Sequence, residues 1–586
     1  MSDLEAQAGA PAAEPNHGFD NSRRLPGPNR YFAGPAVTLT PLGVHAADQA
    51  AHRAWAEHVR EAAAALGWAD PEPRCVERAS GTLLVFRAPP DALFTATDVN
   101  EWAWERAAHA AGELGFDLAQ DLGADAMPTF AARAAAEQRP ELTALRAAAS
   151  AHDVSIIEDD AQVSLGEGKG SCSWARSTLP ALSAVRWSEL HDVPTLLVTG
   201  SNGKTTTVRL LAAIAAAAGL TPGYCSTEGI VVGGTAVMLG DYAGPDGARA
   251  VLRDARVEVA ILETARGGLL RRGLALARAD AAIITNISPD HLGEYGVDGA
   301  EDLAETKLVV AHALGAGGTL ILNADDPVLS HALVRLPHAA RARRSLFAAD
   351  YDHPALVELR ARAGGACGVR GGELLMHQAG QESRLGRIAE MPLSVGGAAH
   401  YNVANLSAAA LGAAALRLPL DAIIEVLHRF GAAPTDNPGR LERWAYRGAT
   451  VLIDYAHNPD GLASLLGVAR SLRPKRLGLL LGQAGNRDDA AIGELARTAA
   501  RFSPDQIVIK ELPLMLRGRA LGEVPALLER ALLAAGFAAD RIRFEPDEEA
   551  AALRLLDGAG PGDVIVLPVH TNSVREPLRA RLSLVQ

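Results

Sequence analysis

The sequence has few of the features that mark secreted, metal-clustered or membrane-spanning proteins. Among its 586 residues there are only four cysteines, and they lie far apart with no metal-type spacing, so neither a disulfide framework nor a cysteine-based zinc site is expected. No apolar run approaches the length of a bilayer span, and the amino terminus is polar and acidic, unlike a secretory signal. We therefore expect a cytoplasmic protein with free thiols and no membrane partner.

Basic residues are also in the minority. The formal net charge is -13, with 21% of residues charged and 48% hydrophobic. This balance argues against nucleic acid or an anionic membrane as a bulk partner, and ordinary solubility is sufficient to explain it. The length exceeds what one hydrophobic core supports, so roughly three or four globular domains are expected.

What the sequence does contain is a glycine loop, Thr199-Gly-Ser-Asn-Gly-Lys-Thr-Thr-Thr207. It follows a strand-like run, residues 194–198, and precedes an alanine-rich stretch that is typical of a helix, residues 208–218. A strand, a glycine loop and a helix N-terminus together bind phosphate, because the amides and the helix dipole favour negative charge. The residues expected to hold the nucleotide here are Gly200, Asn202, Gly203, Lys204, Thr205 and Thr206.

The spacing of this loop is shorter than the usual G-x-x-x-x-G-K-[ST] pattern. A glycine turn with an unrelated lysine is the alternative. We favour a nucleoside triphosphate site because strand and helix fall where phosphate binding requires them, and because Thr205 follows Lys204 where a hydroxyl binds magnesium.

From about residue 193 strands and helices alternate, which predicts a mostly parallel sheet. Two of the predicted strands end in Glu263 and in the segment Asn286 to His291. Ligands of such sheets bind at the carboxyl ends of the strands, so we expect Glu263 and His291 beside the phosphate loop as magnesium or water-shell ligands. The alternative is that Glu263 caps a helix and His291 is a loop histidine.

The predicted organisation is α/β throughout. We expect a disordered tail over residues 1–22, a small α/β domain over 23–187, a central parallel-sheet ATPase domain over 188–432 and a Rossmann-like domain over 433–586. In the first domain a helix is predicted over 100–114, and the glycine-rich segment 163–171 is interpreted as a linker. No catalytic cluster is recognisable in that domain.

In order along the chain, these motifs resemble those of the Mur ligase family of ATP-dependent amide ligases, over residues 193–586. Within that family they are most similar to the ligase half of cyanophycin synthetase. The segments that carry this likeness are Glu263–Gly273 (ETARGGLLRRG), Gly485–Asp489 (GNRDD) and Arg517–Glu523 (RGRALGE). The first domain is more weakly similar, through Leu25–Asn29 (LPGPN) and Leu165–Gly168 (LGEG).

The resemblance implies ATP and Mg²⁺ as cofactors, and formation of an amide between an amino acid and a carboxylate acceptor through an acyl phosphate. It implies catalytic roles for Lys204, Glu263, His291 and Lys307, and metal contacts for Thr205, Glu263, His291 and Lys307, the lysine being one that family members often carbamylate. It also implies nucleotide contacts for Asn405, Arg440, Asp454 and His457.

Two departures from cyanophycin synthetase stand out. That enzyme carries an aspartate-adding ATP-grasp domain where this sequence has only residues 169–198, so we do not expect this chain to make cyanophycin alone. In addition, two acidic motifs of that enzyme are replaced by Lys510–Leu516 and by Pro568–His570. If the lost acids hold arginine, arginine is in doubt as the substrate, and a less basic amine is expected.

Other functions stay open at this stage. One is a polyglutamate-type ligase that acts on another acceptor. Another is a non-catalytic nucleotide-binding paralogue that regulates a partner synthetase, although the intact Lys204, Glu263, His291 and Lys307 argue against it. The first domain could bind an acceptor polymer or form a homo-oligomer, and a separate ATP-grasp synthetase could be a partner.

Overall fold

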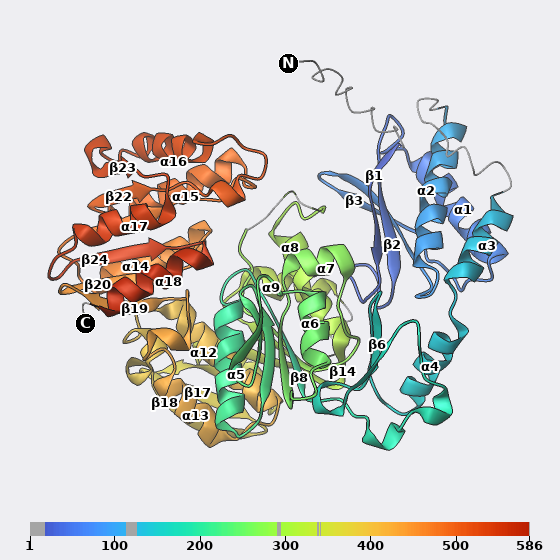
Figure 1. Cartoon of the computed structure of the whole chain (residues 1–586), viewed down its shortest axis with the longest axis horizontal. Coiled ribbons are helices and arrows are strands. Elements are labelled where there is room, and N and C mark those ends of the chain that lie inside the picture. Colours follow the sequence, from blue (N-terminus) through green and yellow to red (C-terminus); the bar gives the residue numbers. More distant parts are fainter. Residues whose placement is uncertain are drawn as a thin grey trace, which may run out of the picture.

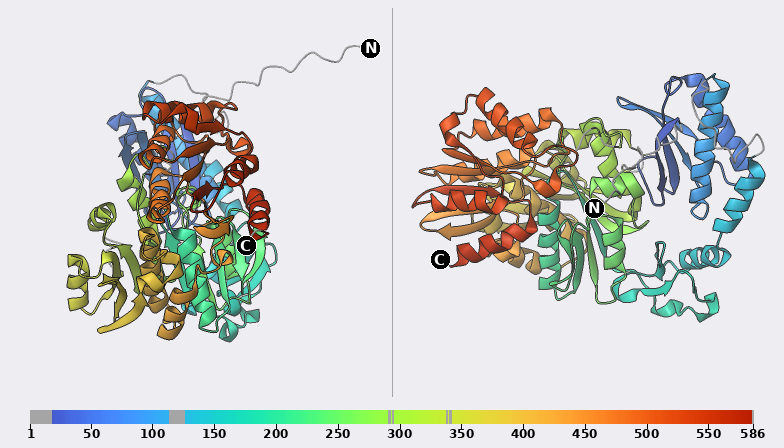
Figure 2. Two further views of the ribbon diagram at one scale, coloured as in Figure 1. Left: turned by 90° about the vertical axis from the view of Figure 1, so that its left-hand side faces the viewer. Right: turned by 45° about the horizontal axis from the view of Figure 1, so that its top comes forward.

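The structure is a computed structural model, and it describes residues 18–112, 126–289, 293, 295–336, 339 and 342–584. Four β-sheets follow one another along the described chain: one of four strands, one of three, one of eleven and one of six. In Figure 1 the amino-terminal and carboxyl-terminal parts lie on opposite sides of the central part, and the right-hand view of Figure 2 shows the same arrangement. This architecture confirms the predicted α/β class.

The amino-terminal domain is an antiparallel sheet in the order β1-β2-β4-β3, covered by helices on one face. Its elements are β1 (Phe19–Leu25), β2 (Ala36–Pro41), α1 (Gln49–Ala65), β3 (Arg74–Arg78), β4 (Gly81–Arg87), α2 (Leu93–Ala110), α3 (Met127–Glu137) and α4 (Pro140–Ala151). The aromatic side chains of Trp55, Trp104 and Phe130 fill its core. Because β1 pairs with β2 from Phe19, the predicted disordered tail does not extend to Ser22.

Two expectations for this region need correction. The helix predicted over 100–114 is α2, which begins earlier, at Leu93. The glycine-rich segment predicted as a linker contains strand structure, since β5 (Ile156–Glu158), β6 (Gln162–Leu165) and β7 (Cys172–Ala175) form a small antiparallel sheet. Its glycine turn packs against the central domain, where the Lys169 amide donates to the Val257 carbonyl at 2.8 Å.

The central domain is an eleven-stranded sheet in the order β11-β10-β9-β12-β8-β13-β14-β15-β16-β17-β18, parallel from β9 to β16 and antiparallel at both edges. Its strands are β8 (Thr195–Thr199), β9 (Pro222–Ser226), β10 (Gly229–Val232), β11 (Thr235–Leu239), β12 (Val259–Glu263), β13 (Ala279–Ile284), β14 (Leu314–Asn323), β15 (Arg343–Asp350), β16 (Gly365–Arg370), β17 (Glu373–Gln378) and β18 (Gln381–Arg387). Its helices are α5 (Lys204–Ala217), α6 (Pro245–Leu252), α7 (Arg266–Arg272), α8 (Ala300–Leu308), α9 (Pro327–Arg335), α11 (Pro354–Ala361), α12 (His400–Ala415) and α13 (Leu420–Arg429).

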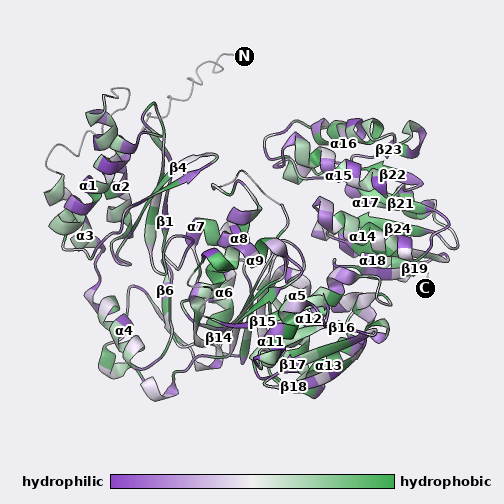
Figure 3. Cartoon of the chain, turned by 180° about the vertical axis from the view of Figure 1, so that it is seen from behind, coloured by the Kyte–Doolittle hydropathy of each residue, from purple (hydrophilic) through white to green (hydrophobic). Residues whose placement is uncertain are grey.

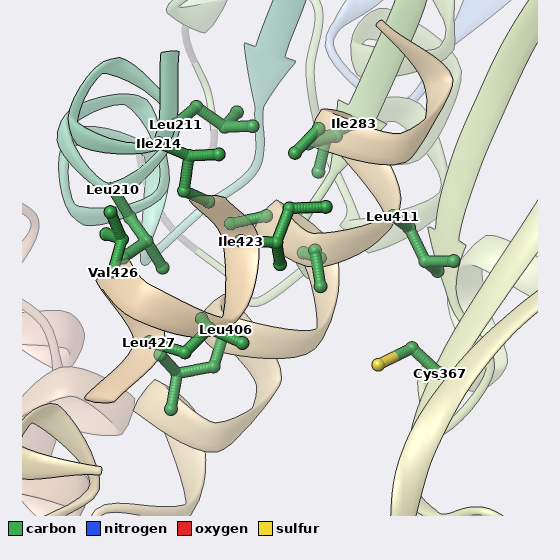
Figure 4. Packing of buried hydrophobic residues seen from close by; sticks show 14 of the residues in the cluster. Leu210, Leu211, Ile214, Ile283, Cys367, Leu406, Leu411, Ile423, Val426 and Leu427 are labelled. Atoms are coloured by element: carbon green, nitrogen blue, oxygen red, sulfur yellow. The ribbon is translucent and has the colours of Figure 1, made fainter. Parts of the chain in front are cut away.

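One core of this domain lies between the sheet and three helices. Figure 4 shows Leu210 and Ile214 of α5 near Val426 and Ile423 of α13, and Leu211 and Leu406 belong to the same buried cluster. Burial of such aliphatic side chains stabilises the fold by about 1.5–3 kcal/mol each. The helix that starts at the phosphate loop is therefore fixed along its length by apolar contacts.

The carboxyl-terminal domain is a six-stranded sheet in the order β19-β20-β24-β21-β22-β23, parallel except for β19. Its elements are β19 (Glu442–Tyr446), β20 (Ala449–Asp454), α14 (Pro459–Ser471), β21 (Leu477–Leu481), α15 (Asp489–Arg501), β22 (Gln506–Ile509), α16 (Glu523–Ala534), β23 (Ile542–Phe544), α17 (Glu548–Asp557), β24 (Val564–Pro568) and α18 (Asn572–Ser583). The strands of the large sheets are mostly hydrophobic (Figure 3), as expected for strands covered by helices on both faces. No helix in the described ranges is long and apolar enough to cross a bilayer.

The amino-terminal domain docks on the central domain through a short turn. The Leu274 amide donates to the Pro28 carbonyl at 2.8 Å, and the Gly27 amide donates to the Arg272 carbonyl at 3.4 Å. A Cβ at Gly27 would lie 1.9 Å from the Leu274 carbonyl oxygen, so this approach requires glycine. Arg30 adds ion pairs to Asp302 at 2.5 Å and Glu305 at 2.6 Å on α8.

Candidate active site

The glycine loop predicted from the sequence connects β8 to α5 at the middle of the central sheet. β8 lies between β12 and β13, and all three strands are parallel, so their carboxyl ends meet at one edge. Gly203 caps α5 with a φ of 86°, and a Cβ there would lie 2.3 Å from Asn405 Oδ1, so this position needs glycine for both its backbone and its space. The amides at the start of α5 therefore open onto the sheet edge.

The neighbouring strand end holds the loop in place. Asn286 accepts from the Asn202 amide through its side chain at 2.9 Å and from the Ser201 amide through its carbonyl at 2.9 Å. Thr285 Oγ1 donates to the Asn202 carbonyl at 2.6 Å. These bonds fix the conformation of the loop without using the amides at the start of α5.

Lys204 and Lys307 both point at the phosphate loop. Lys204 Nζ donates to the Gly200 and Ser201 carbonyls, each at 3.1 Å, and Lys307 Nζ donates to the Gly200 carbonyl at 2.8 Å. Lys307 lies on α8 and is only 3% exposed. Lys307 is therefore not a surface lysine, because its ammonium lies inside the site.

Glu263 provides the most informative polar atom of the site. It ends β12, is 1% exposed, and accepts from Thr205 Oγ1 at 2.8 Å through Oε2. Its other oxygen, Oε1, is buried with no hydrogen-bond partner among the described residues. Burial raises the pKa of Glu263, while the nearby Lys204 acts to lower it. A buried carboxylate oxygen left unpaired is costly, and a cation beside the phosphate loop would satisfy it.

The carboxyl-terminal domain contributes to the same place. Asp454, at the end of β20, accepts from the Leu441 and Ala456 amides, both at 2.7 Å, and burial raises its pKa. The Arg440 guanidinium stacks on the Tyr455 ring at 4.6 Å and pairs with Glu228 of the central domain at 3.3 Å. Asn458 Nδ2 donates to Asn202 Oδ1 at 3.0 Å, so residues 455–458 after β20, called the closure segment below, touch the phosphate loop directly.

One cavity of about 1420 Å³ is lined by these groups from both domains. Among the predicted site residues its walls include Gly200, Asn202, Gly203, Lys204, Thr205, Thr206, Glu263, Lys307, Asn405, Arg440, Asp454 and His457. His291 lies outside the described residues. The described part of the chain contains no cluster of three or more histidine, cysteine or acidic side chains arranged to hold a metal.

Several polar residues of the site carried no recognisable signal in the sequence. Glu228, in the turn between β9 and β10, pairs with Arg209 of α5 at 2.8 Å and with Arg575 of α18 at 2.7 Å. Although burial acts to raise it, the cations of Arg209, Arg440 and Arg575 lower the pKa of Glu228 to about 2. This carboxylate therefore joins the two domains through three guanidinium groups. A single glutamate in a turn has no motif that would have identified it.

Comparisons with known proteins agree with this geometry. Residues 198–413 match the Mur ligase middle domain, and residues 439–568 match the Mur ligase glutamate ligase domain. The UDP-N-acetylmuramyl-tripeptide synthetase of Leifsonia xyli subsp. xyli is 30% identical over 404 residues, which cover 67% of this chain and 73% of that protein. The chain belongs to the Mur ligase family.

Another relative of this Mur ligase is the cyanophycin synthetase of Synechocystis sp., 35% identical over 392 residues. The alignment covers 66% of the present chain and 44% of that enzyme, so the chain spans less than half the length of this curated relative. Among solved structures, that of E. coli FolC in complex with DHPP and ADP aligns with 18% identity and a TM-score of 0.48 over 67% of this chain and 89% of that one.

Proposed function

We propose that this Mur ligase is an ATP-dependent amide ligase that joins an amino acid to a carboxylate acceptor through an acyl phosphate. The observation that supports this most strongly is the single cavity in which the phosphate loop and the unpaired Glu263 oxygen face groups of the carboxyl-terminal domain. Such a cavity can hold a triphosphate at one wall and a second substrate at the other.

In this proposal the phosphate loop and Lys204 bind the β- and γ-phosphates. Lys204 now donates to two loop carbonyls, and a phosphate oxygen would replace these weaker acceptors. Asn405 would contact the adenine side, and Arg440 and Asp454 the nucleotide from the carboxyl-terminal domain. His457 would lie in the closure segment beside them.

The residues present also fit Mg²⁺. Mg²⁺ takes one or two protein oxygens and completes its shell with water and phosphate. Glu263 Oε1 and Thr205 Oγ1 are such oxygens: Thr205 lies in the first turn of α5, and its hydroxyl donates to the other oxygen of Glu263 at the end of β12. His291 and Lys307 would serve the same region, the lysine with or without carbamylation. When bound, the metal would neutralise charge on the phosphates.

In this reaction the protein mainly positions the substrates. An acceptor carboxylate attacks the γ-phosphorus, the bond from that phosphorus to the bridging oxygen breaks, and ADP leaves. The amine nitrogen then attacks the acyl carbon, phosphate leaves, and the nitrogen loses a proton as the amide forms. Contact between Asn458 and Asn202 closes the two domains and excludes the water that would otherwise hydrolyse the acyl phosphate.

Substrate identity is part of this proposal. The acceptor is a peptide or polyamide carboxylate. Because residues 169–198 cannot contain an ATP-grasp domain, any aspartate backbone would have to come from another catalytic unit. A polyglutamate-type ligase with another acceptor is the second candidate, and regulation of a partner synthetase by a non-catalytic chain is the third.

The deciding experiment measures phosphate release from ATP across a panel of amino acids and acceptors, including β-Asp-Arg dipeptides and poly-aspartate. Release that requires one amine and one acceptor, with ADP as the other product, is the expected result. Nucleotide binding without release for any pair would reject the ligase and favour the regulatory alternative.

A further inference from the structure

The wall of the cavity formed by the carboxyl-terminal domain holds a buried cluster that the reaction described above does not use. Lys510 follows β22, Glu548 begins α17 and His570 precedes α18, so three separate segments meet there. Their exposed fractions are 1%, 5% and 6%, respectively. His570 also lines the cavity.

The hydrogen bonds of Lys510 define the state of His570. Its ammonium donates to Glu548 Oε1, to the Pro568 carbonyl, and to His570 Nδ1 at 3.0 Å. An ammonium has three N–H groups, and these three acceptors engage all of them. Burial lowers the pKa of Lys510 to about 8, so the ammonium is its main form at neutral pH.

Because Nδ1 accepts, the neutral imidazole carries its proton on Nε2. Burial lowers the pKa of His570 well below its ordinary value, and the cations of Lys510 and Arg575 and the neighbouring His457 add to this, so the ring is neutral. Nε2 is then a buried donor with no acceptor at hydrogen-bond distance among the described residues, and a weaker interaction with the Ala456 backbone acts in the opposite direction, to raise the pKa of the ring. Such a donor requires an acceptor.

The surroundings of this donor favour an anionic acceptor. The helix α18 begins next to it without a side-chain cap. Glu548 already accepts from the His570 and Thr571 amides, at 2.8 and 3.0 Å, so these two amides are engaged within the protein. Two arginines, Arg487 and Arg517, line the same wall of the cavity.

Acidic groups that could bind a cationic side chain are scarce on this wall. Among the described lining residues from the carboxyl-terminal domain, the acids are Asp454 and Asp460. Asp454 already accepts two amides, and Asp460 is exposed in the first turn of α14. The lining residues Leu512 and Met515 are apolar.

We propose that His570, held by Lys510 and Glu548, is a specificity residue that binds a carboxylate of the incoming amino acid through Nε2–H. This inference rests on the proposed ligase function and names its amine substrate as an acidic or neutral amino acid instead of arginine. Nε2 is buried and the Tyr455 ring packs edge-on against His570, with ring centroids 5.3 Å apart, so the proposal requires Tyr455 to shift when the amino acid binds.

The first test does not need turnover. Nitrogen-15 spectra of the full chain labelled in histidine, with His570 assigned from the His570→Gln variant, should show a neutral ring protonated at Nε2 that does not titrate between about pH 6 and 8. A ring protonated at Nδ1, or one that gains a proton in this range, would overturn the proposal even if the chain were shown to be an active ligase.

The second test compares the preferred amino acid with the decarboxylated amine derived from it. In the wild type, kcat/KM for the amino acid should be at least about 100-fold higher than for the decarboxylated amine. His570→Gln keeps a hydrogen-bond donor and should retain most of this preference. His570→Ala should reduce the preference to below about 10-fold. An equal loss for both amines in His570→Ala, or arginine as the best amine, would overturn the proposal and leave the ligase function intact.

If His570→Ala does not fold, a binding experiment replaces this comparison of rates. Calorimetry then measures the binding of amino acids to the wild type in the presence of ADP and Mg²⁺. Binding of the amino acid with at least about 100-fold weaker binding of its decarboxylated amine is expected, and equal binding of the two would reject the carboxylate site. Absence of phosphate release with every pair, together with selective amino acid binding, would instead reject only the ligase function.

Discussion

In the central domain a buried carboxylate keeps one oxygen unpaired, whereas in the carboxyl-terminal domain a buried ammonium has all its donors engaged. Glu263 ends a strand beside the phosphate loop with Oε1 free of hydrogen bonds among the described residues. Lys510 lies at the corresponding end of β22 and bonds to three acceptors. This difference indicates that Glu263 is placed to bind an external ligand, whereas Lys510 holds a neighbouring side chain in position.

This contrast predicts two kinds of mutant. Substitutions beside the phosphate loop should reduce turnover with little effect on the free energy of unfolding, since the charges of Lys204 and Glu263 are proposed to act on the nucleotide and the cation. Substitutions in the Lys510 cluster should reduce stability, because they leave buried charge unpaired. Five substitutions test this difference between the two sites. Three lie at the two sites, one lies at the junction of the two domains, and one lies outside both sites.

Lys204→Ala should have the largest effect. Removal of the charge that binds the β- and γ-phosphates should reduce ATP-dependent phosphate release by about 10⁴-fold, with unfolding by urea unchanged. The exposed Lys169, which pairs with Glu258 at 2.9 Å, offers a matched control, and Lys169→Ala should keep wild-type turnover. Retained release in Lys204→Ala would remove the phosphate loop from the reaction.

Lys510→Met should reduce the free energy of unfolding by about 3–5 kcal/mol, because Glu548 is left as a buried charge without its cation. Urea denaturation measures this directly. The double variant Lys510→Met/Glu548→Gln should recover part of the loss. A single variant as stable as wild type would mean that the two domains do not differ in their use of buried charge.

Glu263→Gln should reduce turnover by about 10²–10³-fold, because the amide can still accept from Thr205 but carries no charge for a cation. Its free energy of unfolding should equal or exceed that of wild type, since a buried unpaired carboxylate is removed. Urea denaturation curves check the expected stability, and phosphate release at several magnesium concentrations checks the expected loss of turnover. Near wild-type rates at low magnesium would contradict the proposed role.

Glu228→Gln examines the junction of the two domains. The folded pKa of Glu228 is about 2, against an ordinary value of 4.5. Since the lowered pKa is in the folded state, the stabilisation is fully present above pH 4.5 and is lost as the pH falls toward 2. Wild type should exceed the variant by about 2–3 kcal/mol at pH 7, and the gap should close in acid. A gap independent of pH would contradict this account.

Glu167→Gln should have the smallest effect and lies outside both sites. Burial, with Asp192 adding to it, raises the pKa of Glu167 from 4.5 to about 8. Between these values the folded chain holds a proton that the unfolded chain releases, so wild-type stability falls as the pH rises. The variant should match wild type near pH 5 and exceed it by about 1–2 kcal/mol at pH 9 in urea titrations. Lower stability of the variant at pH 9 would refute the raised pKa.

The part of the site that could be predicted from the sequence is the part formed by residues that are close together in the chain. Strand, glycine loop and helix are contiguous from β8 to α5, and Glu263 directly follows its own strand, so local patterns reveal both. The α/β class follows from the same periodicity. Asp454 and His457 of the carboxyl-terminal domain, by contrast, were predicted only through a family resemblance.

The rest depends on contacts between distant segments. Glu228 and Arg575 are 347 positions apart, and Lys510, Glu548 and His570 come from three different strand–helix connections. No spacing rule joins such residues, because the docking of two domains brings Glu228 to Arg575 and the strand order of the carboxyl-terminal sheet brings Lys510, Glu548 and His570 together. The start of β1 was misjudged for a related reason: Phe19–Ser22 are polar and irregular in sequence, and their strand exists because β2 offers a pairing edge.

The turn at Gly27 and Pro28 has a consequence for how such a chain can be recombined. It is bound to the backbone that immediately follows α7, while Arg23 donates to the Leu270 carbonyl within that helix at 3.1 Å. A chimera with a different leading domain would therefore need to keep this turn and its glycine, together with the ion pairs from Arg30 to Asp302 and Glu305. The turn at Gly27 and Pro28 should therefore be kept together with the segment Arg272–Leu274 to which it bonds. The junction of such a chimera would then lie inside the amino-terminal domain.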